Sequence, residues 1–320
     1  MHIGSGKNNK LLYYLRGVSR EAVPDGLFRC RLQRVLASVK NRPDREYILD
    51  RVNYYCRLNV PAELPVWSPS LQDFSRKGSP SVYYFDSKEY TRWFDPRLRW
   101  EYRFGDVTFV PEVPAIVKSR PIEGDNFNSV LLNLDKVRHF TFLRDKVPFR
   151  EKEDRAIFRG HIWGKPNRIR FMELYYGGTL CDCGIIPSGP DFPTEWLRPK
   201  ISLWEHLRYK FVMTLEGNDV ASNLKWVMSS DSLAVMPRPK YETWFMEGRL
   251  IPGYHYVEIR EDFSDLPEKV VYYSSHPEAA EKIIRHAHEY VEQFFDHKRE
   301  RMISLLVLEK YFRMTGQIVK

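Results

Sequence analysis

Apolar residues recur every three or four positions between residues 10 and 58, which predicts a mainly helical start. A proline-rich passage follows, from Pro61 to Pro80. Beyond it the chain shows short runs rich in β-branched and aromatic residues, which predict strands. The expected strands are SVYYF (81–85), DVTFVPEV (106–113), AIFRG (156–160), GTLCDCGII (178–186), YKFVMTLEG (209–217), SLAVMP (232–237) and HYVEI (255–259).

Between residues 156 and 259 the expected strands alternate with helical stretches, as strand, helix, strand, twice over. This order is typical of a doubly wound parallel α/β sheet. We expect an acceptor-side domain with a helical start over residues 1–150, a nucleotide-binding Rossmann-like domain over 151–275, and C-terminal helices over 276–320 that pack back on the body. A long amphipathic helix is predicted there from Ala280, Ile283, Ile284, Ala287, Tyr290, Val291 and Phe294.

Composition narrows the class of protein. An apolar fraction of 43% fits a folded chain, and no stretch approaches the roughly 18 uninterrupted apolar residues of a membrane span. Four scattered cysteines do not form a disulfide framework, and no secretory signal is evident, so we expect a cytoplasmic protein. The net charge of +8 favours anionic partners, namely nucleic acid, an anionic membrane or phosphorylated small molecules, without choosing among them.

The segment YKFVMTLEGNDVASNLKWVM predicts a strand, a turn at Gly217 and a helix that begins near Ser222. A helix start at the carboxyl edge of a sheet offers unpaired amides and positive potential to a diphosphate. Ser222 adds a hydroxyl, and Lys225 adds a positive charge. An ordinary strand-to-helix turn with Ser222 as N-cap explains the same residues equally well.

The segment AIFRGHIWGKPNRIRF repeats this arrangement and carries Arg159, Lys165, Arg168 and Arg170. Arginine binds phosphate oxygens bidentately and keeps its charge when desolvated. Arg159 and Arg168 are therefore candidates to stabilise a departing pyrophosphate, against the alternative of a solvated basic loop, which suits Arg170 best.

A reaction in which a hydroxyl displaces a diphosphate also needs a carboxylate that takes the proton of that hydroxyl. Glu112 lies between two prolines in FVPEVP, where the backbone is stiff, and Asp106 is the second candidate. A surface acid at a strand end is an equally good reading of both. Lys118 and Arg120 are nearby candidates to bind acceptor or donor sugar.

Metal chemistry has little support in the sequence. Cys181 and Cys183 have no second ligand pair at zinc spacing, so two buried strand thiols are expected. The chain also lacks an Asp-x-Asp pair of the kind that holds a metal-bound nucleotide sugar. We therefore expect no metal site.

Residues 209–259, with LEGNDVASNLKWVMSSDSLAVMPRPKYETWFMEGRLIPGYHYVEI, closely resemble glycosyltransferase family 90. FRG at 158–160 and HY-x-x-I at 255–259 match the same family in the same order, and the similarity extends over about residues 100 to 275. The resemblance implies a GT-B-like fold of two facing Rossmann-like domains. It also implies an inverting mechanism without metal or other cofactor, and a UDP-sugar donor.

The resemblance also implies roles for single residues. Arg159 and Gly160 match the family's Arg-Gly near the diphosphate, and Ser222 with Lys225 match its serine and basic element. Tyr241 and Glu242 match an aromatic-acid cluster near the nucleoside, where Glu242 would accept hydrogen bonds from ribose. Val110–Val113 with Pro114 resembles the element that carries the family's proposed base, with Glu112 in place of Asp.

The bacterial branch of the family fits a chain without signal or retention sequences. Its acceptor resembles lipopolysaccharide core, and its donor would be UDP-glucose or UDP-galactose. A lipid-linked acceptor would bring a basic enzyme into peripheral contact with the anionic inner membrane. A kinase of core sugars and a nucleic-acid-binding protein are the alternatives. We expect no nucleic-acid partner, so UDP should raise the melting temperature in the absence of metal, whereas RNA or DNA should not.

Overall fold

The computed structural model describes residues 6–78, 81–187 and 192–318, which form two compact units. Unit 1 contains residues 138–239 and 248–293 and the chain before Asn9. Unit 2 contains residues 9–137 and 240–247 and the chain from Phe294 onward. The boundaries expected at residues 150 and 275 differ from this division, because the segment 240–247 and the last helix return to unit 2.

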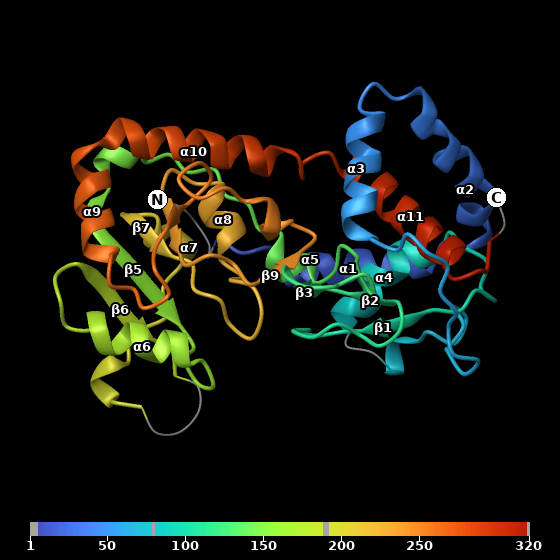
Figure 1. The fold of residues 1–320 in the computed structure, drawn as a ribbon, viewed down its shortest axis with the longest axis horizontal. Coiled ribbons are helices and arrows are strands. Elements are labelled where there is room, and N and C mark those ends of the chain that lie inside the picture. Colours follow the sequence, from blue (N-terminus) through green and yellow to red (C-terminus); the bar gives the residue numbers. More distant parts are fainter. Residues whose placement is uncertain (1–5, 79–80, 188–191, 319–320) are drawn as a thin grey trace. The chain divides into compact units, whose positions relative to one another are not determined.

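Unit 1 is an α/β unit with a five-stranded parallel sheet in the order β10-β8-β7-β5-β6 (Figure 1). The predicted alternation of strands and helices is confirmed here. Its elements are β5 (Glu153–Gly160), α6 (Pro166–Tyr175), β6 (Cys181–Ile185), α7 (Leu203–His206), β7 (Tyr209–Met213), α8 (Leu224–Met228), β8 (Leu233–Met236), β10 (Val257–Glu258), α9 (Leu266–Ser275) and α10 (Pro277–Glu292).

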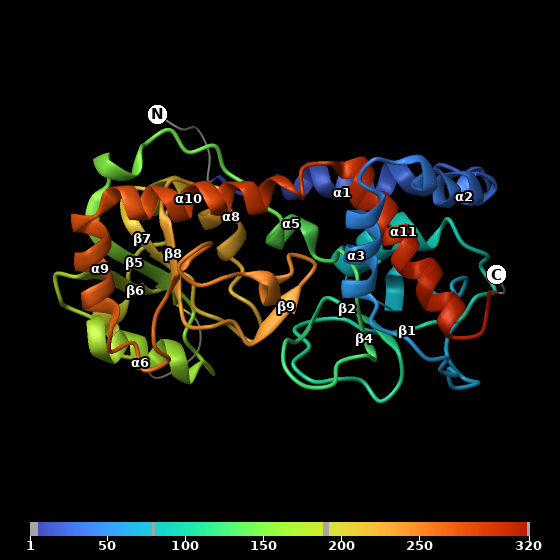
Figure 2. The same ribbon diagram turned by 45° about the horizontal axis from the view of Figure 1, so that its top comes forward.

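The core of unit 1 explains these elements. Alternate residues of β5, Ala156 and Phe158, join side chains of α6, α9 and α10 in one apolar cluster. Cys181 and Cys183 are buried free thiols of the same cluster, as expected. Helices α9 and α10 meet end to end beside the sheet (Figure 2). Helix α10 buries Ala280, Ile283, Ile284, Ala287 and Val291, which belong to the apolar positions that the spacing selects.

Unit 2 combines helices with a three-stranded parallel sheet, β1-β2-β4, and the antiparallel pair β3-β9. Its elements are α1 (Lys10–Glu21), α2 (Gly26–Ser38), α3 (Arg45–Tyr55), α4 (Ser81–Thr91), β1 (Glu101–Arg103), β2 (Ala115–Val117), β3 (Ser119–Pro121), β4 (Ser129–Leu131), β9 (Tyr241–Thr243) and α11 (His297–Met314). The short helix α5 (Lys136–His139) lies where the chain leaves unit 2.

Helix α11 forms the centre of unit 2 and packs against α2, α3 and α4. Asp296 caps its start by accepting hydrogen bonds from the amides of Lys298 and Arg299. Tyr311 connects it to the sheet, because its hydroxyl accepts from the Glu101 amide and donates to the Pro114 carbonyl, both at 2.9 Å.

Two strand predictions are wrong. SVYYF forms the first part of α4, a helix with seven buried residues, and a helix buried on most sides lacks the polar face that marks a helical period. DVTFVPEV contains no strand; Pro111 and Pro114 have no N–H to donate to a ladder, and β2 begins only at Ala115.

Candidate active site

The sheet of unit 1 has a topological switch point between β5 and β7. From β5 the chain crosses to β6 on one side, and then returns to β7 on the other side. In open parallel sheets, ligands bind outside the carboxyl ends of the strands at such a point. Both expected strand-to-helix turns leave the sheet at this edge, so the predicted phosphate-binding segments meet at the position where such sheets bind their ligands.

Arg168 joins these two turns. It belongs to α6, which begins with Pro166 in the first turn, where a missing N–H costs nothing. Its Nη1 donates to the His161 carbonyl at 2.9 Å in the turn after β5. Its Nη2 and Nε donate to the carbonyls of Leu215 and Glu216, at 2.6 and 3.0 Å, in the turn after β7. Arg168 therefore fixes the distance between the two loops.

The positive charge of Arg168 is incompletely balanced. Among the described residues it forms no salt bridge, and burial lowers its pKa to about 10, with Glu216 offsetting this only in part. Arginine has five N–H donors, so two remain for a ligand after the three carbonyl bonds. An anion at this edge would supply the missing countercharge.

Gly160 and Gly217 border the same guanidinium. A Cβ at Gly217 would lie 3.3 Å from Nη2 of Arg168 and 3.6 Å from Cε of Lys165. At Gly160 a Cβ would lie 3.4 Å from Nη1 of Arg168 and 3.2 Å from Cζ of Phe158. The structure thus brings Gly160, Arg168 and Gly217 together, and both glycines leave room for the arginine.

Ser222 and Lys225 lie in different environments. Ser222 is exposed in the turn before α8, and the helix begins two residues later with Asn223 as N-cap. Lys225 is fully buried, so its ammonium does not reach solvent in this structure. Helix α8 has five residues and hence a small dipole. The positive charge at this edge comes from Arg168 and the neighbouring Lys165 rather than from the helix or Lys225.

Arg159 lies near the end of β5, but its guanidinium binds Asp182 on β6. Nη2 donates to Oδ1 of Asp182 at 2.6 Å, and the Tyr209 hydroxyl donates to Oδ2 at 2.6 Å. Burial alone would raise the pKa of Asp182, but the hydrogen bonds from Tyr209 and Arg159 hold that pKa below its usual value. The Arg159 side chain is 7% exposed. In this arrangement it supports the sheet.

Tyr241 and Glu242 lie on β9, in unit 2. Glu242 has no exposed surface, and both its carboxylate oxygens have protein partners. Oε1 accepts from Nε of Arg120 at 2.8 Å, and Oε2 accepts from the Tyr54 hydroxyl. Arg57 approaches Oε1 at 3.6 Å. Glu242 is the countercharge to a buried arginine in this structure, and both its carboxylate oxygens are bound within unit 2. The expected contact of Glu242 with ribose stays a prediction.

Glu112 is exposed on the loop between β1 and β2 in unit 2. Asn128 holds this loop by donating its amide to the carbonyls of Pro111 at 3.1 Å and Glu112 at 2.8 Å. Tyr311 binds the Pro114 carbonyl at the other end of the loop. The backbone is thus fixed on both sides of a solvent-facing carboxylate. Asp106, the second candidate, is instead ion-paired with the buried Lys118.

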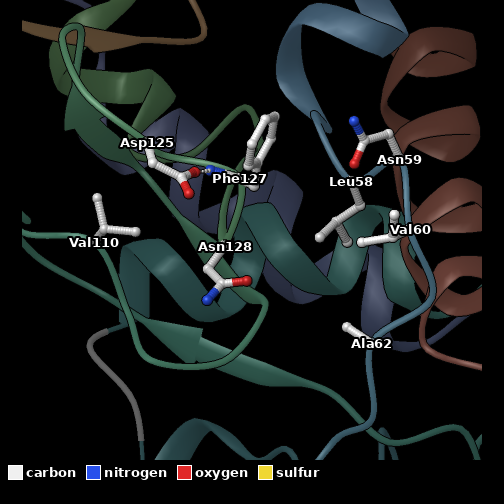
Figure 3. A pocket seen from close by; sticks show the side chains of 8 residues that line it. All are labelled: Leu58, Asn59, Val60, Ala62, Val110, Asp125, Phe127 and Asn128. Carbon is white, nitrogen blue, oxygen red and sulfur yellow. Dashed lines mark hydrogen bonds between the residues drawn. The ribbon is translucent and has the colours of Figure 1, made fainter.

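A hollow of about 230 Å³ opens beside this loop (Figure 3). Asp125 and Asn128 contribute polar groups, and Phe127 contributes a ring that is 43% exposed. Carboxylate, amide and aromatic groups together suit a sugar ring, which has hydroxyls at its rim and apolar faces. The sequence analysis did not single out these residues, because residues 125–128 form no motif and the hollow depends on chain segments distant in sequence. Its lining residues are Leu58, Asn59, Val60, Ala62, Val110, Asp125, Phe127 and Asn128.

His255, the first residue of the HY pair, should make the stability of unit 1 depend on pH. Its Nδ1 accepts a hydrogen bond from the Ile251 amide at 2.9 Å, and burial together with His286 lowers its pKa from 6.5 to about 4. As the pH falls, the unfolded chain takes up this proton first. The stability contributed by neutral His255 is therefore complete above pH 6.5 and declines between 6.5 and 4.

We expect the variant His255→Asn, whose amide oxygen can accept the same hydrogen bond, to lose less stability on acidification. The difference between the two proteins should be on the order of 2 kcal/mol from about pH 7 to pH 4.5. Urea unfolding at both pH values measures it. Equal losses in both proteins would show that His255 does not carry this pH dependence.

Across the described part of the chain, no helix combines the length and apolar character needed to cross a bilayer.

The sequence matches the family described as Glycosyl transferase family 90 over residues 130–315. It is 45% identical over 270 residues to O-glucosyltransferase LpsA of Dichelobacter nodosus, with 84% of each chain covered. It is also 29% identical to human Protein O-glucosyltransferase 3 over 167 residues. This aligned stretch covers 50% of this chain and 32% of the human protein.

Proposed function

The chain belongs to glycosyltransferase family 90, and from this premise we propose that it is an inverting glucosyltransferase that uses a UDP-sugar. The main support for a donor site is the position of Arg168 at the switch point of a parallel sheet. Among the described residues, this cation has no carboxylate partner. Family membership favours glycosyl transfer over the sugar-kinase and nucleic-acid alternatives.

The donor is proposed as UDP-glucose, with UDP-galactose as the second candidate. Both the bacterial and the human relative are named O-glucosyltransferases, which supports glucose. In the proposed complex the diphosphate lies against Arg168, with the backbone at Gly160 and Gly217 and the Ser222 hydroxyl near it. Because Arg168 supplies fixed positive charge, we propose that transfer needs no divalent metal.

The acceptor is proposed as a carbohydrate of lipopolysaccharide core, bound on unit 2 in the hollow beside Glu112. The similarity to LpsA over most of both chains supports this choice. A core acceptor attached to lipid places the enzyme at the cytoplasmic face of the inner membrane. The GT-B-like fold belongs to the same proposal; two α/β units, each with its own parallel sheet, are what such a fold requires.

In the proposed reaction Glu112 removes the proton of an acceptor hydroxyl while its oxygen attacks the anomeric carbon. The bond from that carbon to the phosphate oxygen breaks, and UDP leaves with its electron pair. Arg168 stabilises the charge that develops on the diphosphate. Glu112 suits the base because its loop is fixed while its carboxylate remains exposed.

The test compares Glu112→Gln with the unchanged protein, by measuring UDP release from UDP-glucose and UDP-galactose with core oligosaccharide and EDTA present. We expect faster turnover of UDP-glucose, and a loss of about 100-fold or more in kcat for Glu112→Gln with KM for the donor little changed. Glu123→Gln, another exposed acid of unit 2, is the control and should remain active. An active Glu112→Gln protein would assign the base to another carboxylate, and complete inhibition by EDTA would refute metal independence.

A further inference from the structure

Helix α1 exposes a row of apolar side chains. Leu11, Leu15 and Val18 are 69%, 58% and 49% exposed, and their spacing of four and three residues places them on one face of the helix. Leu12, at 44%, borders this row. Single exposed leucines are ordinary, whereas a continuous row on one helix indicates an interaction surface.

We call Leu11, Leu15 and Val18 the leucine row. The opposite face of α1 packs against α4, so the exposure of the leucine row does not come from a loosely held helix (Figure 1). The Tyr13 hydroxyl donates to the Asp86 carboxylate at 2.8 Å. Gly17 lies against the ring of Phe85, where a Cβ would approach Cδ1 to 2.7 Å. Arg20 pairs with Glu89 at 2.7 Å. These contacts set the rotation of α1 and direct the leucines outward.

Exposed positive charge lies on α1 itself and on α2, the next helix along the chain. Residues 10–38, which contain α1 and α2, hold six Lys or Arg and two Asp or Glu, so this segment carries a net charge of +4 out of the +8 of the chain. One of the two acids, Asp25, is already neutralised by Arg92 and Lys88. Exposed basic residues lie on both helices, at Lys10, Arg16, Arg29, Arg31 and Arg34.

The positive charge of α1 and α2 indicates which kind of partner can cover the exposed leucine row. A second copy of the chain would bring the same positive segment against this one, and like charges would oppose the contact. A hydrophilic polyanion would satisfy the charges but leave the leucines in water. A bilayer that contains anionic lipid offers acyl chains to the leucines and headgroups to the arginines and lysines.

We propose that α1, with the basic residues of α2, is a docking surface for an anionic membrane. Helix α1 lies in the plane of the interface and inserts Leu11, Leu15 and Val18 below the headgroups. This surface deepens the proposed function, since it would bring the enzyme to a lipid-linked acceptor. The evidence for it comes from α1 and α2 and not from the donor site.

The test measures co-sedimentation with vesicles of equal parts phosphatidylcholine and phosphatidylglycerol, and with phosphatidylcholine alone. The full chain should bind the anionic vesicles, and added salt should weaken binding. The variant Leu11→Ser/Leu15→Ser/Val18→Ser should bind at least about tenfold more weakly, because three apolar side chains no longer insert. The variant Arg29→Gln/Arg31→Gln/Arg34→Gln should bind more weakly and depend less on salt.

The control variant is Val66→Ser/Trp67→Ser, which removes two side chains of unit 2 that are 83% and 80% exposed but lie outside α1 and α2. It should bind as the unchanged protein does. All variants should release UDP from UDP-glucose at the same rate with a water-soluble acceptor. Vesicle binding without any UDP release would refute the proposed function and leave the docking surface intact.

Three results would overturn the docking surface: no preference for anionic vesicles, unchanged binding by the leucine variant, or equal loss of binding in the control variant. Sedimentation velocity without lipid adds a fourth. If the chain is a dimer that the leucine variant converts to a monomer, the row is an interface between copies instead.

Discussion

Replacing Arg168 with alanine is expected to lower kcat/KM for UDP-glucose by about 100- to 1000-fold, the usual cost of removing one group that stabilises developing charge. The side chain is the partly buried cation that joins the turns after β5 and β7. The loss of its three hydrogen bonds to carbonyls should cost about 1 kcal/mol each, so the protein should remain folded. Donor turnover and a UDP titration that follows the melting temperature measure both effects.

Arg170 provides a matched control on the same helix. Its side chain is 58% exposed and pairs only loosely with Glu173, at 3.6 Å. Arg170→Ala should therefore retain activity and the stabilisation by UDP. Arg168→Lys keeps the charge, but its compact ammonium cannot span the carbonyls of both turns as the planar guanidinium does, so its activity should lie between those of Arg168→Ala and Arg170→Ala. If Arg168→Ala still binds UDP as the unchanged protein does, the diphosphate does not bind at the switch point.

Glu242→Ala is expected to destabilise the protein by about 3–5 kcal/mol, because it leaves the guanidinium of Arg120 buried without a countercharge. Both side chains of this ion pair have zero exposure. The other donors of Arg120 bind the carbonyls of Tyr54, Tyr55 and Ser129, so the arginine cannot easily turn toward solvent. Urea unfolding of the variant measures the loss.

Two further variants separate this role from a contact with the donor. Glu242→Gln keeps the size of the side chain and one acceptor oxygen for Arg120 but removes the charge, so its loss of stability should be smaller than that of Glu242→Ala. Glu63→Ala, an exposed acid of the same unit, should change stability little. A Glu242→Ala protein of normal stability that only raised KM for UDP-glucose would instead support the contact with ribose.

The sequence was informative where local pattern and structure coincide. The five strands of the unit 1 sheet, β5, β6, β7, β8 and β10, bury apolar runs, and such runs are visible in sequence because both faces of a parallel sheet are covered. The helical region at residues 10–58 is likewise confirmed as α1, α2 and α3. Helix α4 was missed because a buried helix rich in aromatic residues resembles a strand in composition.

The cations at the two turns show what a single sequence leaves open. Arg159 lies near the end of β5, and Arg168 lies in the helix that follows this strand. As arginines, both suit phosphate equally. Only the fold shows that Arg159 is neutralised by Asp182, whereas Arg168 binds carbonyls that carry no full charge. Asp182 lies 23 residues away in sequence from Arg159, so no local spacing could have indicated the pair.

The sequence by itself determined the parallel α/β sheet, the two strand-to-helix turns at its carboxyl edge and the resemblance to a family of glycosyltransferases. Tertiary structure decided which charged residues remain available, namely Arg168 at the switch point and Glu112 on a fixed loop, and it left the leucine row of α1 exposed. It also enclosed Lys225 and Glu242. The physical reason is that secondary structure follows from neighbours along the chain, whereas burial and countercharge depend on side chains that only folding brings together.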